Sequence, residues 1–220
     1  MQKRKIVIGD YDTAAHGWTL TGWRLADAEQ KTKYVEKVNG DGSWDLSTSL
    51  TDGQPKYKDR ELTATFECSE GTRMEREETI RYMINLLDGL RWKIKLPDDD
   101  HHYIVGRVHV IREYNDLAHA AVTLTAVCEP WKYANAETVV ALVAATEKQT
   151  VKLYNRGKRA IVPLLTVKGS SVLLEHGTGS LALSEGTYQW PDLLLTTGSH
   201  ALIYSGTGSV VISYREAVLE

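Results

Sequence analysis

One segment of this chain has the spacing of an amphipathic helix, and the sequence around it alternates with the period of β-strands. Thr72 and Glu75 form a Thr-x-x-Glu capping box, in which each side chain satisfies a backbone N–H of the first helical turn. Apolar residues then follow at i, i+3, i+4 and i+7, namely Ile80, Met83, Ile84 and Leu87. Gly89 suits the left-handed residue that ends a helix. The sequence therefore predicts a helix of about four turns from near Thr72 to Asp88.

Strand-like alternation surrounds this helix. Residues 61–68 place Leu, Ala, Phe and Cys at every second position, which is typical of a half-buried strand. Residues 91–111 predict a β-hairpin, because two alternating segments flank the turn sequence Pro97-Asp98-Asp99-Asp100. A further strand over 118–128 stops before Pro130. This order predicts an α+β domain with one helix on an antiparallel sheet.

The composition changes after residues 129–137, a segment without periodicity, and we expect the domain junction there. The two domains would comprise residues 1–133 and 134–220. Beyond the junction charges become fewer, Gly, Ser and Thr become more frequent, and short strands recur at intervals of roughly 8–12 residues. We expect these strands near residues 138–145, 150–154, 160–168, 171–175, 180–183, 192–196, 200–205 and 209–214. The fold class is thus mainly β, with a C-terminal β-sandwich of galectin or jelly-roll character.

Two similar glycine-rich segments lie in this second domain. Gly177-Thr178-Gly179-Ser180 and Gly206-Thr207-Gly208-Ser209 each join two short apolar stretches. Glycine supplies the positive φ that short hairpin connections need, so both are predicted to be hairpin turns. Neither precedes a helix or a P-loop lysine, which argues against a nucleotide site.

Clusters of titratable residues give no sign of catalysis, so we do not expect an enzyme. The densest cluster, Asp98–His102, consists of consecutive residues whose side chains would diverge, and we interpret it as a solvated hairpin tip. The loop at Asp41 has Leu46 where a calcium loop requires glycine. Cys68 and Cys128 sit at strand positions and are expected to be buried free thiols. The sequence therefore predicts no catalytic residues, no cofactor and no metal ligands.

Charge and hydropathy limit the partners further. The 220 residues carry a formal net charge of −3, and this lack of basic excess argues against nucleic-acid binding. No apolar run approaches the roughly 20 residues that span a bilayer, so membrane insertion is not expected. The first residues lack a signal-peptide pattern, which favours synthesis in a cytoplasm.

Tryptophan and tyrosine are unusually frequent relative to phenylalanine. The chain has 6 Trp and 11 Tyr but only 1 Phe. Trp and Tyr favour half-exposed positions at protein interfaces or sugar-binding platforms. Trp18, Trp23, Trp92, Trp131 and Tyr133 fall in the first domain or the junction. Tyr188 and Trp190 fall in the second domain, where they are candidate contacts for a sugar or a partner protein.

The order of several short motifs resembles the distal tail proteins of siphophages, a tail-component family often called Dit. In the first domain these motifs are Asn39-Gly40-Asp41-Gly42, Tyr57-Lys58-Asp59-Arg60, Ile84–Gly89, Leu96–Asp100, Tyr103–Val108 and Cys128-Glu129-Pro130-Trp131-Lys132. The second domain is similar to the sandwich of short tail components at Asn155-Arg156-Gly157, Val162-Pro163 and Val211–Glu216. The resemblance covers about four-fifths of the chain, whereas the first 20 residues depart from it.

This resemblance implies a structural protein of a phage or prophage tail tip. Distal tail proteins form a ring, commonly a hexamer, that joins the tail tube protein to the tail-tip and receptor-binding proteins. The first domain would form the ring, the second would face outward, and the location would be the virion. Two alternatives stay open. The second domain could be a carbohydrate-binding module or adhesin that uses Tyr188 and Trp190, or, less favoured, the chain could hydrolyse cell-wall glycan.

Overall fold

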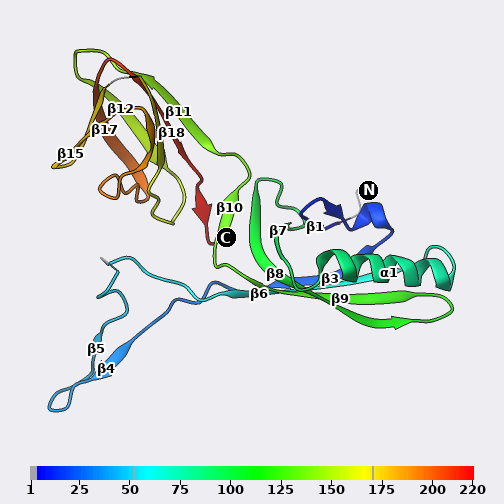
Figure 1. Ribbon diagram of the computed structural model, residues 1–220. Coiled ribbons are helices and arrows are strands. Elements are labelled where there is room, and N and C mark those ends of the chain that lie inside the picture. Colours follow the sequence, from blue (N-terminus) through cyan, green and yellow to red (C-terminus); the bar gives the residue numbers. More distant parts are fainter. Residues whose placement is uncertain (1–3, 52, 170) are drawn as a thin grey trace. The chain divides into compact units, whose positions relative to one another are not determined.

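The computed structural model describes residues 4–51, 53–169 and 171–220, and it divides into two compact units, residues 1–132 and 133–220. The division falls one residue from the expected junction. Strands dominate both units (Figure 1), which confirms the mainly β fold class. The described helices are one α-helix and one short 3₁₀ turn, η1 (Ala14–His16), both in the first unit. No helix in the described part of the chain is long and apolar enough to cross a membrane.

The first unit is built on an antiparallel sheet in the order β2-β1-β7-β8-β9-β6-β3. Its strands are β1 (Val7–Ile8), β2 (Tyr11–Asp12), β3 (Thr19–Leu25), β6 (Arg60–Cys68), β7 (Arg91–Lys95), β8 (His102–Asn115) and β9 (Ala120–Cys128). The predicted strand at 61–68, the hairpin at 91–111 and the strand at 118–128 are confirmed as β6, β7–β8 and β9. Strands β1 to β3 were not predicted.

Helix α1 (Arg73–Leu87) lies on one face of this sheet (Figure 1). The capping box is present, because Glu75 Oε2 accepts from the Thr72 N–H at 2.7 Å and Thr72 Oγ1 accepts from the Glu75 N–H at 3.3 Å. The helix buries an apolar face against alternate residues of the central strands. This core includes Ile80, Met83 and Leu87 of the helix with Leu62, Ala64, Phe66, Val108, Val122 and Leu124 of the sheet. The predicted helix and its position on the sheet are thus confirmed.

The described residues between 26 and 59, which join β3 to β6, form an extended two-stranded arm that the sequence did not predict. Backbone hydrogen bonds Lys31 N–Lys56 O and Lys58 N–Glu29 O, both 2.8 Å, hold its two halves together. A small hairpin, β4 (Tyr34–Glu36) and β5 (Ser43–Asp45), lies farther along the arm. The Asp41 loop connects these two strands, so the loop interpretation is confirmed.

The second unit is a sandwich of two four-stranded antiparallel sheets, as predicted. One sheet has the order β11 (Thr138–Val143), β18 (Ser209–Tyr214), β13 (Leu164–Lys168) and β16 (Gly186–Gln189). The other has the order β12 (Gln149–Asn155), β17 (Gly198–Gly206), β14 (Val172–His176) and β15 (Gly179–Leu183). Their inner faces share a core that includes Leu153, Leu165, Leu174, Leu202 and Ile212. At the margin of this unit β10 (Lys132–Ala134) pairs with β19 (Ala217–Val218).

The predicted strand at 192–196 is wrong. Leu193 and Leu195 are fully buried, but they belong to an irregular segment that makes only an isolated bridge, Ile161↔Leu195. The edge strand is instead β16, at Gly186–Gln189. The alternating leucines thus predicted buried side chains correctly, but the strand they suggested does not form.

One of the two glycine-rich turns also differs from expectation. Gly177-Thr178 joins β14 to β15, which pair as a hairpin. Gly206–Ser209 instead leads from β17 in one sheet to β18 in the other, so it is not a hairpin turn. A Cβ at Gly206 would stand 2.2 Å from the Ser171 carbonyl oxygen, and its φ is +128°. Glycine is needed at this crossing because two backbones pass in close contact.

Candidate functional site: the exposed arm and nearby surfaces

The arm is the most unusual surface of the first unit. None of the described residues between 26 and 59 is buried. Large apolar side chains are nevertheless frequent there, with exposed fractions of 61% for Tyr34, 56% for Trp44 and 97% for Leu50. A two-stranded hairpin without a core is only marginally stable in water. The arm is therefore a candidate interaction surface.

Partly buried contacts fix the base of this arm. The Arg60 guanidinium donates from Nε to the Ala26 carbonyl oxygen at 2.6 Å and from Nη1 to the Pro130 carbonyl oxygen at 3.4 Å. The Tyr57 ring meets Trp131 edge-on, with ring centroids 5.4 Å apart. These contacts join the two ends of the arm to the last residues of the first unit. The arm is thus anchored at its base and exposed beyond it.

The sheet face opposite α1 is a second candidate interaction surface. Strands β6 and β9 alternate regularly, so residues that do not face the core line up on this opposite side. Threonines form cross-strand pairs there, Thr63↔Thr125 and Thr65↔Thr123. Neighbouring Ile111 and Val127 are 48% and 60% exposed. This face is mostly polar, with apolar residues at its margins.

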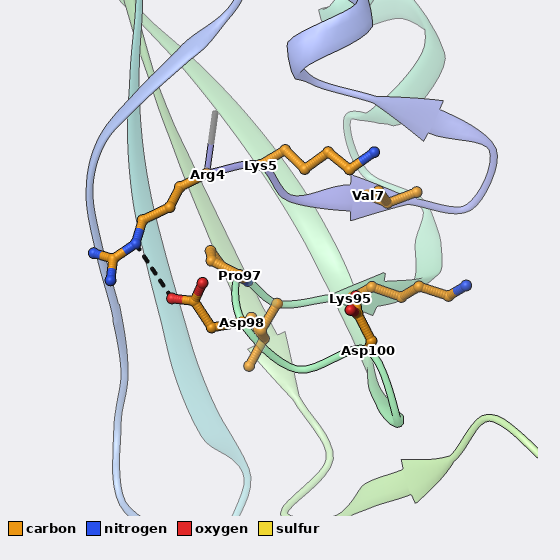
Figure 2. A pocket seen from close by; sticks show the side chains of 8 residues that line it. Arg4, Lys5, Val7, Lys95, Pro97, Asp98 and Asp100 are labelled. Atoms are coloured by element: carbon orange, nitrogen blue, oxygen red, sulfur yellow. Dashed lines mark ion pairs between the residues drawn. The ribbon is translucent and has the colours of Figure 1, made fainter. Parts of the chain in front are cut away.

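A charged cleft lies beside β1 and the β7–β8 connection (Figure 2). Its lining residues are Arg4, Lys5, Val7, Lys95, Leu96, Pro97, Asp98 and Asp100. In Figure 2 the Arg4 side chain reaches toward Asp98, and Arg4 Nε lies 3.2 Å from Asp98 Oδ2. Both side chains are largely exposed, so this ion pair contributes little stability. The mixed charges give the cleft no clear preference for an anion or a cation.

Within the Asp98–His102 cluster, Asp99 is the shared partner of His102 and Lys132. Asp99 Oδ1 accepts from the His102 N–H at 3.1 Å and lies 3.0 Å from His102 Nδ1, while Lys132 Nζ donates to Asp99 Oδ2 at 3.3 Å. Burial raises the pKa of Asp99, but the hydrogen bonds and charges of His102 and Lys132 outweigh it, and the pKa lies below its ordinary value. The tip is therefore only partly solvated, because Asp99 and His102 are half-buried.

The two cysteines are buried free thiols, as predicted. Burial raises the pKa of the Cys128 thiol to about 12, so it is protonated at neutral pH and is a poor nucleophile. Among the described residues, no group of three or more His, Cys, Asp and Glu side chains could hold a metal ion.

The two candidate contact residues of the sandwich lie close in sequence but differ in exposure. Trp190 is 5% exposed, and its Nε1 donates to Asp192 Oδ2 at 3.2 Å. Its indole belongs to the core and offers no open stacking face. Tyr188, on edge strand β16, is half-buried, and its hydroxyl lies 3.3 Å from Ser184 Oγ. Trp44, which the sequence did not single out, is a more exposed aromatic residue than either.

Comparison with known proteins identifies a similar fold. No family model and no curated protein sequence matches the chain. Among solved structures, the chain is similar to the Dit protein (gp 19.1) of SPP1, described as a paradigm of the hub adsorption apparatus in phages that infect Gram-positive bacteria. The TM-score is 0.70 at 14% sequence identity, over 97% of this chain and 99% of that one. The chain therefore has the fold of a distal tail protein along nearly its whole length.

Proposed function

We propose that this protein is a structural hub of a phage or prophage tail tip, and that it works as a ring-shaped homo-oligomer without catalysis. The single observation that carries the proposal is the exposed apolar arm on a chain with the distal tail fold. A ring needs a heterologous interface, in which one surface of each copy meets a different surface of the next. The arm supplies one such surface, because its Tyr34 and Trp44 side chains find no core within their own chain.

In this proposal the two units have different tasks. The first unit, with its arm, forms the ring, which we expect to be a hexamer because the family resemblance implies that number. The sandwich carries tail-tip and receptor-binding proteins, while the ring contacts the tail tube protein. The location would then be the virion. A carbohydrate-binding role for the sandwich would rest mainly on Tyr188, since the Trp190 indole is buried. This supports the hub over the adhesin.

Native mass spectrometry of the full chain over a concentration series tests the ring. We expect a closed oligomer that dissociates on dilution, and we expect Trp44→Ala to shift the equilibrium toward monomer. Tyr154→Ala is the matched control, because Tyr154 is 52% exposed, close to the 56% of Trp44, but lies in the sandwich. A monomer at every concentration, or equal effects of the two substitutions, would contradict the proposal.

A glycan array tests the alternative. Saturable binding that Tyr188→Ala abolishes would favour the carbohydrate-binding module, whereas the hub proposal expects no such binding by this chain.

A further inference from the structure

Two histidines lie next to each other in the second unit, His176 at the end of β14 and His200 near the start of β17. Their ring centroids are 5.9 Å apart and the ring planes are inclined by 54°. The two strands are hydrogen-bonded neighbours. His176 lies two residues from Leu174, and His200 lies two residues from Leu202, so each histidine shares the inner face of the sheet with a core leucine. Both side chains are half-buried at the margin of that core.

Backbone carbonyl groups fix the proton positions of both rings. His176 Nδ1 lies 3.0 Å from the Ala201 carbonyl oxygen, and His200 Nε2 lies 2.8 Å from the Thr196 carbonyl oxygen. A carbonyl oxygen only accepts hydrogen bonds, so in the neutral rings these two nitrogens carry the hydrogen. The lone pairs therefore reside on His176 Nε2 and His200 Nδ1. An imidazole that donates one N–H to a carbonyl and keeps the other nitrogen bare is in the state that binds metals.

The ring separation suits a shared ion. Imidazole nitrogens bind Zn²⁺ at 2.0–2.1 Å, so the centres of two rings on one ion lie roughly 5 Å apart at the tetrahedral angle and roughly 6 Å apart when the nitrogen–metal–nitrogen angle opens to about 135°. The observed 5.9 Å corresponds to the wider angle. The two residues are far apart in sequence, so they form no short-spaced zinc-ligand motif.

We propose that His176 and His200 together bind one divalent transition-metal ion, Zn²⁺ or Cu²⁺, through Nε2 of the first and Nδ1 of the second. Imidazole is a preferred ligand for both ions. Since no third ligand joins the pair among the described residues, water or a side chain of a partner protein completes the coordination. The site lies wholly within the sandwich, so the inference is independent of the ring proposed above.

The test uses the full chain without an affinity tag, freed of metal by a chelator. Titration with Zn²⁺ followed by calorimetry is expected to show one saturable site per chain. His176→Gln and His200→Gln should each lower the Zn²⁺ affinity by at least about tenfold. His102→Gln is the control, because His102 lies in a different cluster, beside Asp99. The proposal would be overturned if His102→Gln lost Zn²⁺ binding while the other two variants kept it. It would also be overturned if the unmutated chain showed no saturable binding below millimolar Zn²⁺.

A second measurement on the unmutated chain does not depend on how the variants fold. With ¹⁵N-labelled histidine, Zn²⁺ should shift the ring resonances of His176 Nε2 and His200 Nδ1 and leave their hydrogen-bonded nitrogens protonated. The Cu²⁺ form should show hyperfine coupling to two nitrogens by electron paramagnetic resonance. Shifts confined to other histidines, or coupling to a single nitrogen, would refute a shared ion.

Discussion

Arg76, in the first turns of α1, donates a hydrogen bond to the backbone carbonyl oxygen of Asp116, 2.9 Å away in the β8–β9 connection. The same guanidinium donates to the carbonyl oxygens of Leu117 at 3.1 Å and Gly71 at 2.7 Å. Arg76 is only 3% exposed. One buried side chain therefore joins the helix, the segment before it and the far end of the longest hairpin.

Replacement of Arg76 should destabilise the first unit. Arg76→Met would leave three carbonyl oxygens without their donor, and we expect it to lower the free energy of unfolding by about 2 kcal/mol or more. Arg76→Lys keeps a charge and fewer donors, so its loss should be smaller. Urea unfolding followed by circular dichroism measures both variants. Equal stability of Arg76→Met and the unmutated protein would contradict this assignment.

The capping box of α1 predicts both a stability change and its pH dependence. Thr72→Ala should lower the free energy of unfolding by about 1 kcal/mol. The hydrogen bonds from the Thr72 backbone and hydroxyl hold the pKa of Glu75 below its ordinary value. Between the two pKa values the unfolded chain binds more protons than the folded one. The contribution of Glu75 is therefore fully present above the ordinary glutamate pKa and lost as the pH falls through the lowered one.

Comparing the unmutated protein with Glu75→Gln in urea unfolding from about pH 6 to about pH 3 measures that contribution. The stability difference should shrink toward acid. A difference that is constant over this range would show that the carboxylate charge is not involved.

Gly106 on β8 should not tolerate a side chain. A Cβ there would stand 2.5 Å from Cys128 Sγ and 3.0 Å from the Val127 carbonyl oxygen. Gly106→Ala is expected to cost about 1–3 kcal/mol through strain in a closely packed sheet. Gly40→Ala is the control, because its nearest neighbours are Lys37 side-chain atoms at 3.8 Å and 3.9 Å. Thermal unfolding should show a lower midpoint for the first variant alone.

The buried Cys128 thiol should resist alkylation. With its pKa raised to about 12, the thiolate population at pH 8 is very small, and the side chain is 1% exposed. Iodoacetamide should modify Cys128 only after unfolding in urea, as followed by peptide mass spectrometry. A Leu117→Cys variant gives the comparison, because Leu117 is 90% exposed. Similar rates at Cys128 and at the introduced cysteine would contradict the buried environment.

Elements that are marked by residues close together in the sequence could be predicted. The helix is an example, since Thr72 and Glu75 mark its start and the apolar spacing marks its buried face. The β6 and β9 strands were equally clear because one side of each faces the core. What periodicity did not reveal was that Arg76 and Arg60 are buried. Each satisfies backbone carbonyls from segments far away in sequence.

The arm could not be predicted for a different reason. Sequence periodicity arises when one face of a segment is buried, and none of the described arm residues is buried within this chain. Trp44 and Tyr34 therefore gave no pattern. In the sandwich the error was the reverse. Leu193 and Leu195 alternate as in a strand because their side chains are buried, but their segment lacks the hydrogen bonds of a β-ladder. The histidine pair likewise depends on strand pairing that brings together residues distant in sequence.

The two ends of the arm enter neighbouring antiparallel strands, where Leu25 faces Leu62. Residues can therefore be added to or removed from its outer part without altering the register of the sheet. The entropic cost of a longer connection grows only slowly with its length. The arm is consequently a module whose reach can diverge between relatives while the scaffold that carries it keeps its shape.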